Sequence, residues 1–299
     1  MTPTPTEKGP IMGDDEKRTY PTGVPCWVQL DTPDTAGAAA FYAGLFGWTY
    51  ASAIPTEPAA YLFARLDGAD APGPRADVAA LALSARSEPG AEAPHGWVSF
   101  IATDDIEQTC ADIEAAGGTL IELPDAGSPF GRGARCADPL GAVFGLWEAR
   151  AHPGAQVVNA PGAWNFSDLV TPDIPASMGF YSTVWGWEYD PGLAAGRIRL
   201  PGYGAHLAST VDPGIHERQS FAPEGFADAV AEIFESTDDE PAPGWWVRFA
   251  VADRDESALV AERLGGEIVS RTDTEWTLEA VLRDPQGNAF IVSQLAPRS

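Results

Sequence analysis

The apolar and polar positions of the chain repeat the same pattern twice. Residues 27–50 and residues 166–189 each begin with a short apolar run that ends at a Thr-Pro-Asp turn. A helix is predicted after each turn, because apolar residues recur at spacings of three and four until a glycine stops the pattern. Asp34 and Asp173, which can cap these helices, are 139 positions apart, and the two stretches align at that offset without a gap. A repeat of this regularity predicts a duplicated unit.

Each copy continues with more strands and then with a second kind of unit. Apolar runs at residues 60–66 and 78–85 give the first unit the order β-α-β-β-β. A unit of the same order starts at Gly96 with a strand at 97–102, and it returns near the C-terminus with a strand that begins at Trp246. The fold class is therefore predicted to be α+β, with four βαβββ modules forming two domains.

The composition of the segments between modules predicts the domain boundaries. A disordered segment is expected at 1–22, domains at 23–150 and 163–299, and a linker at 151–162 that is rich in Pro, Gly and Ala. The second domain carries an insertion at about 211–244. Phe226, Val230 and Phe234 are spaced as on a helix there, which predicts a short surface helix that either covers a pocket or packs between modules.

Charge narrows the classes of partner. The 299 residues hold 18 Lys and Arg against 43 Asp and Glu, so the formal net charge is −25. A surface of this sign repels phosphate backbones and anionic lipids, so neither nucleic acid nor membrane is expected as a partner. Cys26, Cys110 and Cys136 fit no metal or disulfide framework, and the N-terminal residues lack the apolar core of a signal peptide. We therefore expect a cytoplasmic monomer or homodimer that binds a small molecule.

The motifs resemble those of a known superfamily. Paired βαβββ modules with FY..LFGW after the first strand and DP.G before the last are similar to the vicinal oxygen chelate superfamily. That group includes glyoxalases, extradiol dioxygenases and bleomycin-resistance proteins, and the order of motifs here is most similar to its tandem, two-domain glyoxalase-like members. The resemblance implies two glyoxalase-like domains, each with its modules curving around a cup.

The same resemblance implies where metal ligands would lie. In this sequence those positions are occupied by Trp27, Trp97, Gly145, Phe166, Trp246 and Ile291. None of these side chains can ligate a divalent cation. His206 is a candidate donor near one further ligand position, and one donor does not make a site. A metal-dependent glyoxalase or dioxygenase is therefore disfavoured, and no cofactor is expected.

Alternation along the strands predicts which side chains line the two cups. The expected lining of the N-terminal cup is Trp27, Gln29, Trp97, Ser99 and Trp147, and that of the C-terminal cup is Phe166, Asp168, Trp246, Arg248, Ile291 and Ser293. Asp168 and Arg248 are expected to pair across the C-terminal cup, either as a structural ion pair or as a base and an anion-stabilising donor. His206 is either a structural residue or a third acid–base group.

Three hypotheses about function follow. The first is a metal-independent enzyme of secondary metabolism that acts on a small aromatic or polyketide-like metabolite by acid–base chemistry. The reaction would be a rearrangement, elimination, hydration or cofactor-free oxygenation, with the C-terminal cup as the active site. The second is a non-catalytic protein that sequesters a drug-like molecule, as bleomycin-resistance proteins do. The third is a fold that serves as a protein-interaction module.

Overall fold

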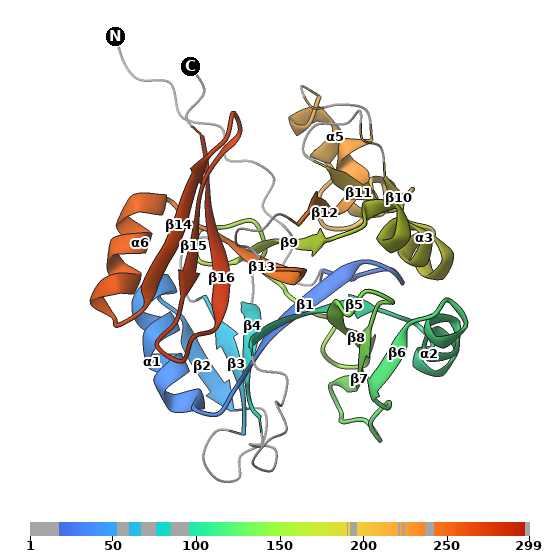
Figure 1. Cartoon of the computed structure of the whole chain (residues 1–299), viewed down its shortest axis with the longest axis horizontal. Coiled ribbons are helices and arrows are strands. Elements are labelled where there is room, and N and C mark those ends of the chain that lie inside the picture. The colour runs from blue at the N-terminus through green and yellow to red at the C-terminus, as the bar shows by residue number, and fades with distance from the viewer. Residues whose placement is uncertain are drawn as a thin grey trace.

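Each half of the chain folds into one eight-stranded sheet (Figure 1). The computed structural model describes residues 18–52, 60–66, 76–84, 96–189, 191, 196–220, 222, 225–236 and 242–296. Most of the N-terminal segment predicted to be disordered, residues 1–17, lies outside the described residues. The predicted α+β class with four βαβββ modules in two domains is confirmed, since each sheet joins the strands of two consecutive modules.

The first sheet, sheet A, has the order β2-β3-β4-β1-β5-β8-β7-β6. Its strands are β1 (Pro25–Thr32), β2 (Thr49–Ser52), β3 (Tyr61–Arg65), β4 (Asp77–Leu83), β5 (Gly96–Ala102), β6 (Thr119–Glu122), β7 (Gly131–Ala137) and β8 (Val143–Ala149). β1 and β5 pair antiparallel at the centre of the sheet, and each also runs parallel to the last strand of its own module, β4 and β8.

Sheet B repeats this topology in the order β10-β11-β12-β9-β13-β16-β15-β14. Its strands are β9 (Trp164–Thr171), β10 (Glu188–Tyr189), β11 (Arg197–Arg199), β12 (Ala229–Glu235), β13 (Gly244–Ala250), β14 (Glu267–Asp273), β15 (Thr277–Arg283) and β16 (Ala289–Leu295). β9 and β13 form the central antiparallel pair, as β1 and β5 do in sheet A.

The predicted helix ends are present in both copies. In α1 (Thr35–Phe46) the Asp34 carboxylate accepts a hydrogen bond from the Gly37 amide at 2.9 Å, and in α3 (Ile174–Trp185) Asp173 caps Ala176 in the same way. The helix of each second module is also capped by an aspartate, in α2 (Ile106–Ala115) and α6 (Arg254–Arg263). These caps satisfy amide groups that have no partner within the helix.

Each hydrophobic core is built from one module of each half. α1 packs against α6, and α2 packs against α3, so modules distant in sequence share a core. The residues of the repeated motif hold these contacts together. Tyr42 donates to Asp284 at 3.2 Å, and Trp48 donates to the Gly162 carbonyl at 2.7 Å. The equivalent bonds from the second copy join Tyr181 to Asp138 and Trp187 to the Gly23 carbonyl.

The insertion differs from the prediction. Helix α4 (Tyr203–Ser209) ends just before it, and helix α5 (Ile215–Arg218) and a 3-10 turn at Phe226–Asp228 lie within it. The helix predicted through Phe226, Val230 and Phe234 is wrong, because Val230 and Phe234 belong to strand β12. A spacing of four also fits a strand, where every second residue points to the same face. β12 is thus the last strand of its module.

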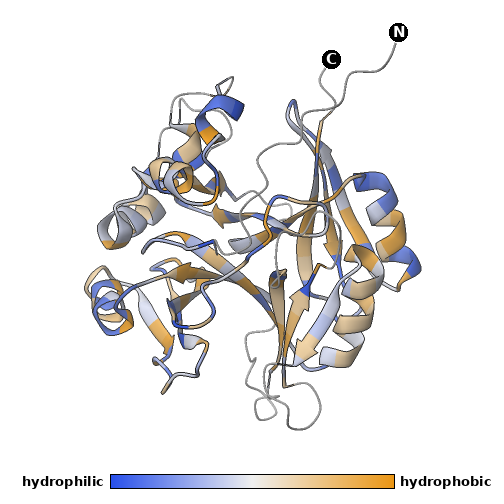
Figure 2. Ribbon diagram, turned by 180° about the vertical axis from the view of Figure 1, so that it is seen from behind, coloured by the Kyte–Doolittle hydropathy of each residue, from blue (hydrophilic) through white to orange (hydrophobic). Residues whose placement is uncertain are grey.

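The colouring by hydropathy agrees with this layering. Figure 2 shows the strands near the centre of the molecule to be mostly apolar, whereas hydrophilic residues are frequent on α5 and α6. Among the helices of the described ranges, none combines the length and the apolar composition that crossing a membrane would require.

Candidate functional site

The N-terminal cup is the face of sheet A that carries Trp27, and the chain's own side chains fill it. Trp27 is 2% exposed, and its ring packs against Phe63 and against His152 from the linker, with ring centroids 6.1 Å and 4.5 Å away. The His152 ring also stacks on Phe63 at 4.9 Å, and Trp147 donates to the His152 carbonyl at 2.8 Å. Trp27 and Trp147 therefore lie on the predicted face, but as packing groups.

The polar groups of this cup are paired with one another. Asp31 accepts a hydrogen bond from Gln29 at 2.6 Å and forms an ion pair with Arg135 at 2.5 Å. Asp77 pairs with Arg65 at 2.8 Å and lies 3.6 Å from the His152 ring. Burial raises the pKa of the Asp77 carboxyl, but the contacts with His152 and Arg65 outweigh burial and hold that pKa below its usual value.

Trp97 and Ser99 do not face the N-terminal cup, so their predicted place there is wrong. In the antiparallel pairing of β1 and β5, Trp97 lies opposite Leu30 and points to the core, where it donates to Tyr42 at 2.9 Å. Ser99 lies against Ser167 of the other sheet, with their hydroxyl oxygens 2.6 Å apart. Trp97 corresponds to Trp245, which donates to Tyr181 at the same distance. The prediction aligned Trp97 with Trp246 instead. That alignment shifts the strand by one residue and assigns each of its side chains to the opposite face of the sheet.

The C-terminal cup, the face of sheet B that carries Phe166, holds a cavity of about 570 Å³. A volume of this size is typical of sites for small organic molecules. From the sheet, the cavity is lined by Phe166, Arg197, Glu232, Arg248, Thr277 and Ser293. Further lining residues come from the N-terminal segment, the linker, and helices α4 and α5. The predicted residues Phe166, Arg248 and Ser293 are thus brought together at one cavity.

A cluster of buried charges forms part of this cavity wall. Arg248 forms ion pairs with Asp168 at 2.5 Å, with Glu232 at 3.0 Å and with Glu279 at 3.1 Å. Glu232 also pairs with Arg197 at 2.8 Å. The predicted pairing of Asp168 with Arg248 is therefore present. Three carboxylates share two guanidinium groups, so the cluster carries one surplus negative charge when every member is ionised.

Burial and this charge surplus act on Asp168. Asp168 is 2% exposed, and its Oδ1 atom has no hydrogen-bond partner in the part of the chain that the structure describes. Burial raises the pKa of Asp168 to about 7, Arg248 opposes that rise, and the charges of Glu232 and Glu279 add to it. The same three carboxylates hold the pKa of Arg248 above its ordinary value, although burial alone would lower it. The cluster can therefore gain or lose one proton near neutral pH.

The remaining predicted site residues lie outside the cavity lining. Asp168 lies behind Arg248, and Ile291 is buried on the same face, opposite Arg248 in the pairing of β13 with β16. Trp246 is half-buried and donates to the Ala242 carbonyl at 2.7 Å. His206 lies on helix α4, and its Nε2 atom is 3.2 Å from the Thr19 carbonyl. The predicted acid–base role of His206 thus has no geometric support.

Two charged residues of sheet B that line the cavity, Glu232 and Arg197, are absent from the predicted site. Glu232 is a lone carboxylate inside an apolar run, which is the signal that could have identified it as a buried polar group. The guanidinium of Arg197 lies over two rings, with its Cζ atom 5.3 Å from the centroid of Phe166 and 4.7 Å from that of Phe226. Phe226 belongs to the 3-10 turn of the insertion and Phe166 to strand β9. The Arg197 guanidinium therefore links the insertion to sheet B through its contacts with both rings.

The donor set of the C-terminal cup does not fit a divalent metal ion. Arg248 already lies among the three carboxylates that could have ligated a cation, and it bonds to each of them. Within the described ranges, no group of three His, Cys, Asp or Glu side chains is arranged to hold a metal. The guanidinium supplies the positive charge that a metal would otherwise bring to this position.

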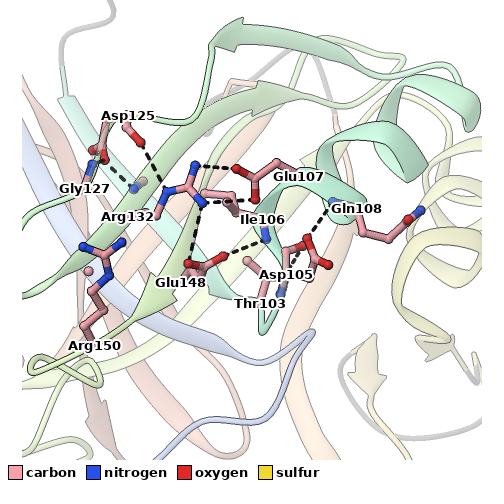
Figure 3. A network of polar contacts seen from close by, with 12 residues as sticks. Thr103, Asp105, Ile106, Glu107, Gln108, Asp125, Gly127, Arg132, Glu148 and Arg150 are labelled. Carbon is pink, nitrogen blue, oxygen red and sulfur yellow. Dashed lines mark hydrogen bonds and ion pairs between the residues drawn. The ribbon is translucent and has the colours of Figure 1, made fainter.

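A second charged cluster, on the N-terminal domain, has a different character. Figure 3 shows Arg132 of β7 between Glu107 of α2 and Glu148 of β8, with Oε atoms 2.5 Å and 3.8 Å from the guanidinium. Glu148 also accepts a hydrogen bond from the Ile106 amide at 3.0 Å. Glu107 is exposed, so solvent screens this cluster. Its bonds fasten α2 to the sheet, and none of its residues lines the cavity of the C-terminal cup.

Comparison with known proteins decides the family. A model described as "Glyoxalase/Bleomycin resistance protein/Dioxygenase superfamily" matches residues 27–146, and one described as "Glyoxalase-like domain" matches residues 164–293. Over 292 residues the chain is 32% identical to the anthracycline biosynthesis protein DnrV of Streptomyces peucetius, which covers 92% of this chain and 94% of the relative. The chain belongs to the glyoxalase/bleomycin resistance/dioxygenase superfamily.

Other members of this superfamily are similar over almost the whole chain. CFP32 of Mycobacterium tuberculosis, which carries the word glyoxylase in its name, is 31% identical over 298 residues, covering 93% of this chain and 97% of the relative. Among solved structures, the Mn(II)-bound glyoxalase from Novosphingobium aromaticivorans has a TM-score of 0.56 at 16% identity, covering 91% of this chain and 82% of that one. The 2,3-dioxygenase LapB from Pseudomonas sp. KL28 has a TM-score of 0.55 at 14% identity, covering 91% and 93%. These structures establish the fold.

Proposed function

We propose that the C-terminal cup binds a flat, largely apolar metabolite and moves a proton on it without a metal ion. Glu232 lines the cavity and exchanges the proton with the metabolite. Arg248 lies beside Glu232 and stabilises negative charge that develops on an oxygen of the metabolite. Asp168 acts as a positioning residue, because it holds Arg248 from behind and can carry the surplus proton of the cluster.

The observation that carries this proposal is the mismatch of charge at the cavity wall. Two guanidinium groups face three carboxylates there. Burial is the main cause that raises the pKa of Asp168 to about 7, and the charges of Glu232 and Glu279 add to it. Acid–base catalysis is most effective when the pKa of the catalytic system lies near the working pH. Perturbed carboxyl groups beside a cavity are typical of active sites.

The relatives favour an aromatic polyketide as the class of metabolite. Two of the similar proteins, DnrV and DauV, are named for anthracycline biosynthesis. Phe166, Phe226 and Trp164 supply flat apolar surface around the cavity, which suits a fused aromatic ring system.

Exchange of hydrogen with solvent tests the proposal directly. The protein is incubated with a panel of anthraquinone aglycones in D₂O containing EDTA, and deuterium incorporation is followed by mass spectrometry. We expect exchange with at least one aglycone, loss of about 100-fold or more of the rate in Glu232→Gln, and no change in the N-terminal cup variant Tyr61→Phe. Exchange that requires an added metal, or that survives in Glu232→Gln, would contradict the proposal.

Sequestration is the second candidate function, and one observation favours it. Both terminal nitrogens of Arg248 already contact carboxylates of the protein. The charges in the cavity wall are therefore paired without any contribution from a metabolite. Binding of an aglycone in the same assay, without exchange or any change in its mass, would identify a binding protein of the bleomycin-resistance kind.

A further inference from the structure

Part of the cavity wall is built outside sheet B. This part of the wall consists of Arg18 and Tyr20 of the N-terminal segment, Tyr203 and Leu207 of α4, and Arg218 at the end of α5. Hydrogen bonds between the Arg18 backbone and the Gln156 side chain hold the N-terminal segment there. The Arg18 backbone amide donates to Gln156 Oε1 at 3.1 Å, and Gln156 Nε2 donates to the Arg18 carbonyl at 3.2 Å.

Arg18 differs from the other arginines that line the cavity. Arg197, Arg218 and Arg248 each form an ion pair with a carboxylate. Between residues 18 and 296, in the ranges that the structure describes, no carboxylate forms an ion pair with Arg18. Its neighbour is the Tyr203 phenol instead. Burial raises the pKa of Tyr203, and the Arg18 guanidinium partly offsets that rise. Among the described residues, this half-buried cation and the phenol hydroxyl beside it are two hydrogen-bond donors without an anionic partner.

We propose that Arg18 and Tyr203 form a subsite for an anionic group, so that the metabolite is an acidic aromatic compound bearing a carboxylate. The inference rests on the proposed function of the C-terminal cup and adds the chemical class of its ligand. An arginine binds a carboxylate through two parallel hydrogen bonds, and a tyrosine hydroxyl can supply a third. The aromatic body of the ligand then extends over Phe166 and Phe226 toward Glu232 and Arg248.

The charge of the whole protein makes this selectivity informative. A net charge of −25 repels anions in general, so a non-specific surface would bind an acid more weakly than its neutral amide. A preference for the acid must therefore come from a local cation in the cavity. Arg197, Arg218 and Arg248 are neutralised by their carboxylate partners, so Arg18 is the lining arginine that supplies this charge.

A matched pair of probes tests the subsite. Anthracene-2-carboxylate and anthracene-2-carboxamide differ in charge and have the same ring system, and their Kd values are measured by titration calorimetry. We expect the intact protein to bind the carboxylate about 10-fold or more tightly than the amide. Arg18→Gln should abolish this preference by weakening the carboxylate alone, Arg18→Lys should retain part of it, and Tyr203→Phe should reduce it by a smaller factor.

A control variant and two different negative outcomes separate failure of the subsite from failure of the cup. Arg150→Gln removes an arginine that bonds to the Ser128 carbonyl on the N-terminal domain, and it should leave both Kd values unchanged. Equal Kd values for the two probes, or a preference that survives in Arg18→Gln with an unchanged melting temperature, would overturn the subsite while the cup remains a binding site. If neither probe binds, the proposed function fails and the subsite fails with it.

Discussion

The two cups are built on the same topology and carry different side chains at matching positions. In the order N-terminal then C-terminal cup, the matched pairs are Trp27 and Phe166, Gln29 and Asp168, Ala80 and Glu232, Phe100 and Arg248, and Trp147 and Ser293. The N-terminal set is neutral and bulky, and it closes the cup together with His152 from the linker. The C-terminal set is charged, and Ser293 is smaller than its counterpart Trp147. This set leaves a cavity of about 570 Å³.

The difference shows what the duplication provides. A cup packed with aromatic rings contributes apolar burial to the free energy of folding, whereas a cup with charged residues at the matched positions and an open cavity does not gain that contribution. Because each hydrophobic core contains one module of each half, the packed N-terminal copy can support the open C-terminal copy. The predictions below test this division of roles.

The largest effect is expected from Arg248→Met. The substitution leaves the buried Asp168 and Glu232 and the half-buried Glu279 without their shared counter-charge. Breaking such a cluster costs about 3–5 kcal/mol in the free energy of unfolding. Urea denaturation at pH 8, where carboxyl groups are ionised, measures it. Adding Asp168→Asn and Glu232→Gln imitates the neutral set of the N-terminal cup and should restore most of the stability. A stable Arg248→Met single variant would show that the charges are not coupled.

Trp27→Ala should destabilise the protein by about 3 kcal/mol or more, since it removes a large side chain that is fully enclosed. Phe166→Ala, at the matching position, opens onto the cavity and should cost distinctly less. Binding of an aromatic probe should respond in the opposite sense, with a loss in Phe166→Ala and little change in Trp27→Ala. Thermal melts and titrations on the two variants measure both. Equal losses of stability would contradict the division between a packed and an open cup.

The pH dependence of stability should reveal the C-terminal cluster. The pKa of Asp168 is about 7 in the folded protein and about 4 in an unfolded chain, so the folded state binds more protons between these values. This contribution to stability is present below about pH 4 and is lost as the pH rises through 7, with a slope of at most about 1.4 kcal/mol per pH unit. The stability of the wild type minus that of Asp168→Asn should therefore fall from pH 5 to pH 7. A difference that rises over this range would mean a lowered pKa.

The smallest effect is expected from Ser99→Ala. The Ser99 hydroxyl contacts Ser167 between the two sheets, so its loss should cost about 1 kcal/mol and should leave probe binding unchanged. Ser293→Ala, on the cavity wall, serves as the comparison and should change probe affinity with little effect on stability. A loss of probe binding in Ser99→Ala would show that Ser99 contacts a bound ligand, and it would contradict this placement of Ser99.

The fold could be predicted because local rules and the repeat agree. The two Thr-Pro-Asp turns, the helices that they cap and the terminal glycines are where the sequence places them. The partners of the repeated tyrosines and tryptophans could not be predicted, since Tyr42 and Asp284 are 242 positions apart and meet only through the exchange of modules between halves. The motif that identifies the superfamily is therefore also the set of contacts between its domains.

The errors in the site have identifiable physical causes. Trp245 and Trp246 are adjacent, and aligning Trp97 with the wrong one moved a strand by one residue and assigned Trp97 and Ser99 to the wrong face. The glycines that end the helices could have corrected it, since Gly117 and Gly265 are 148 positions apart whereas Trp97 and Trp246 are 149 apart. Glu232 was missed because β12 was interpreted as a helix, although the pairing of Asp168 with Arg248 could be predicted from the strands alone.

The central claim, that the C-terminal cup binds the ligand and the N-terminal cup does not, is tested most directly by hydrogen–deuterium exchange. Amide exchange is measured over the whole chain with and without saturating anthracene-2-carboxylate. We expect slower exchange in Tyr203–Ser209, Ile215–Arg218 and Ala229–Glu235, and no change in Tyr61–Arg65. Protection confined to the strands around Trp27 would contradict the claim.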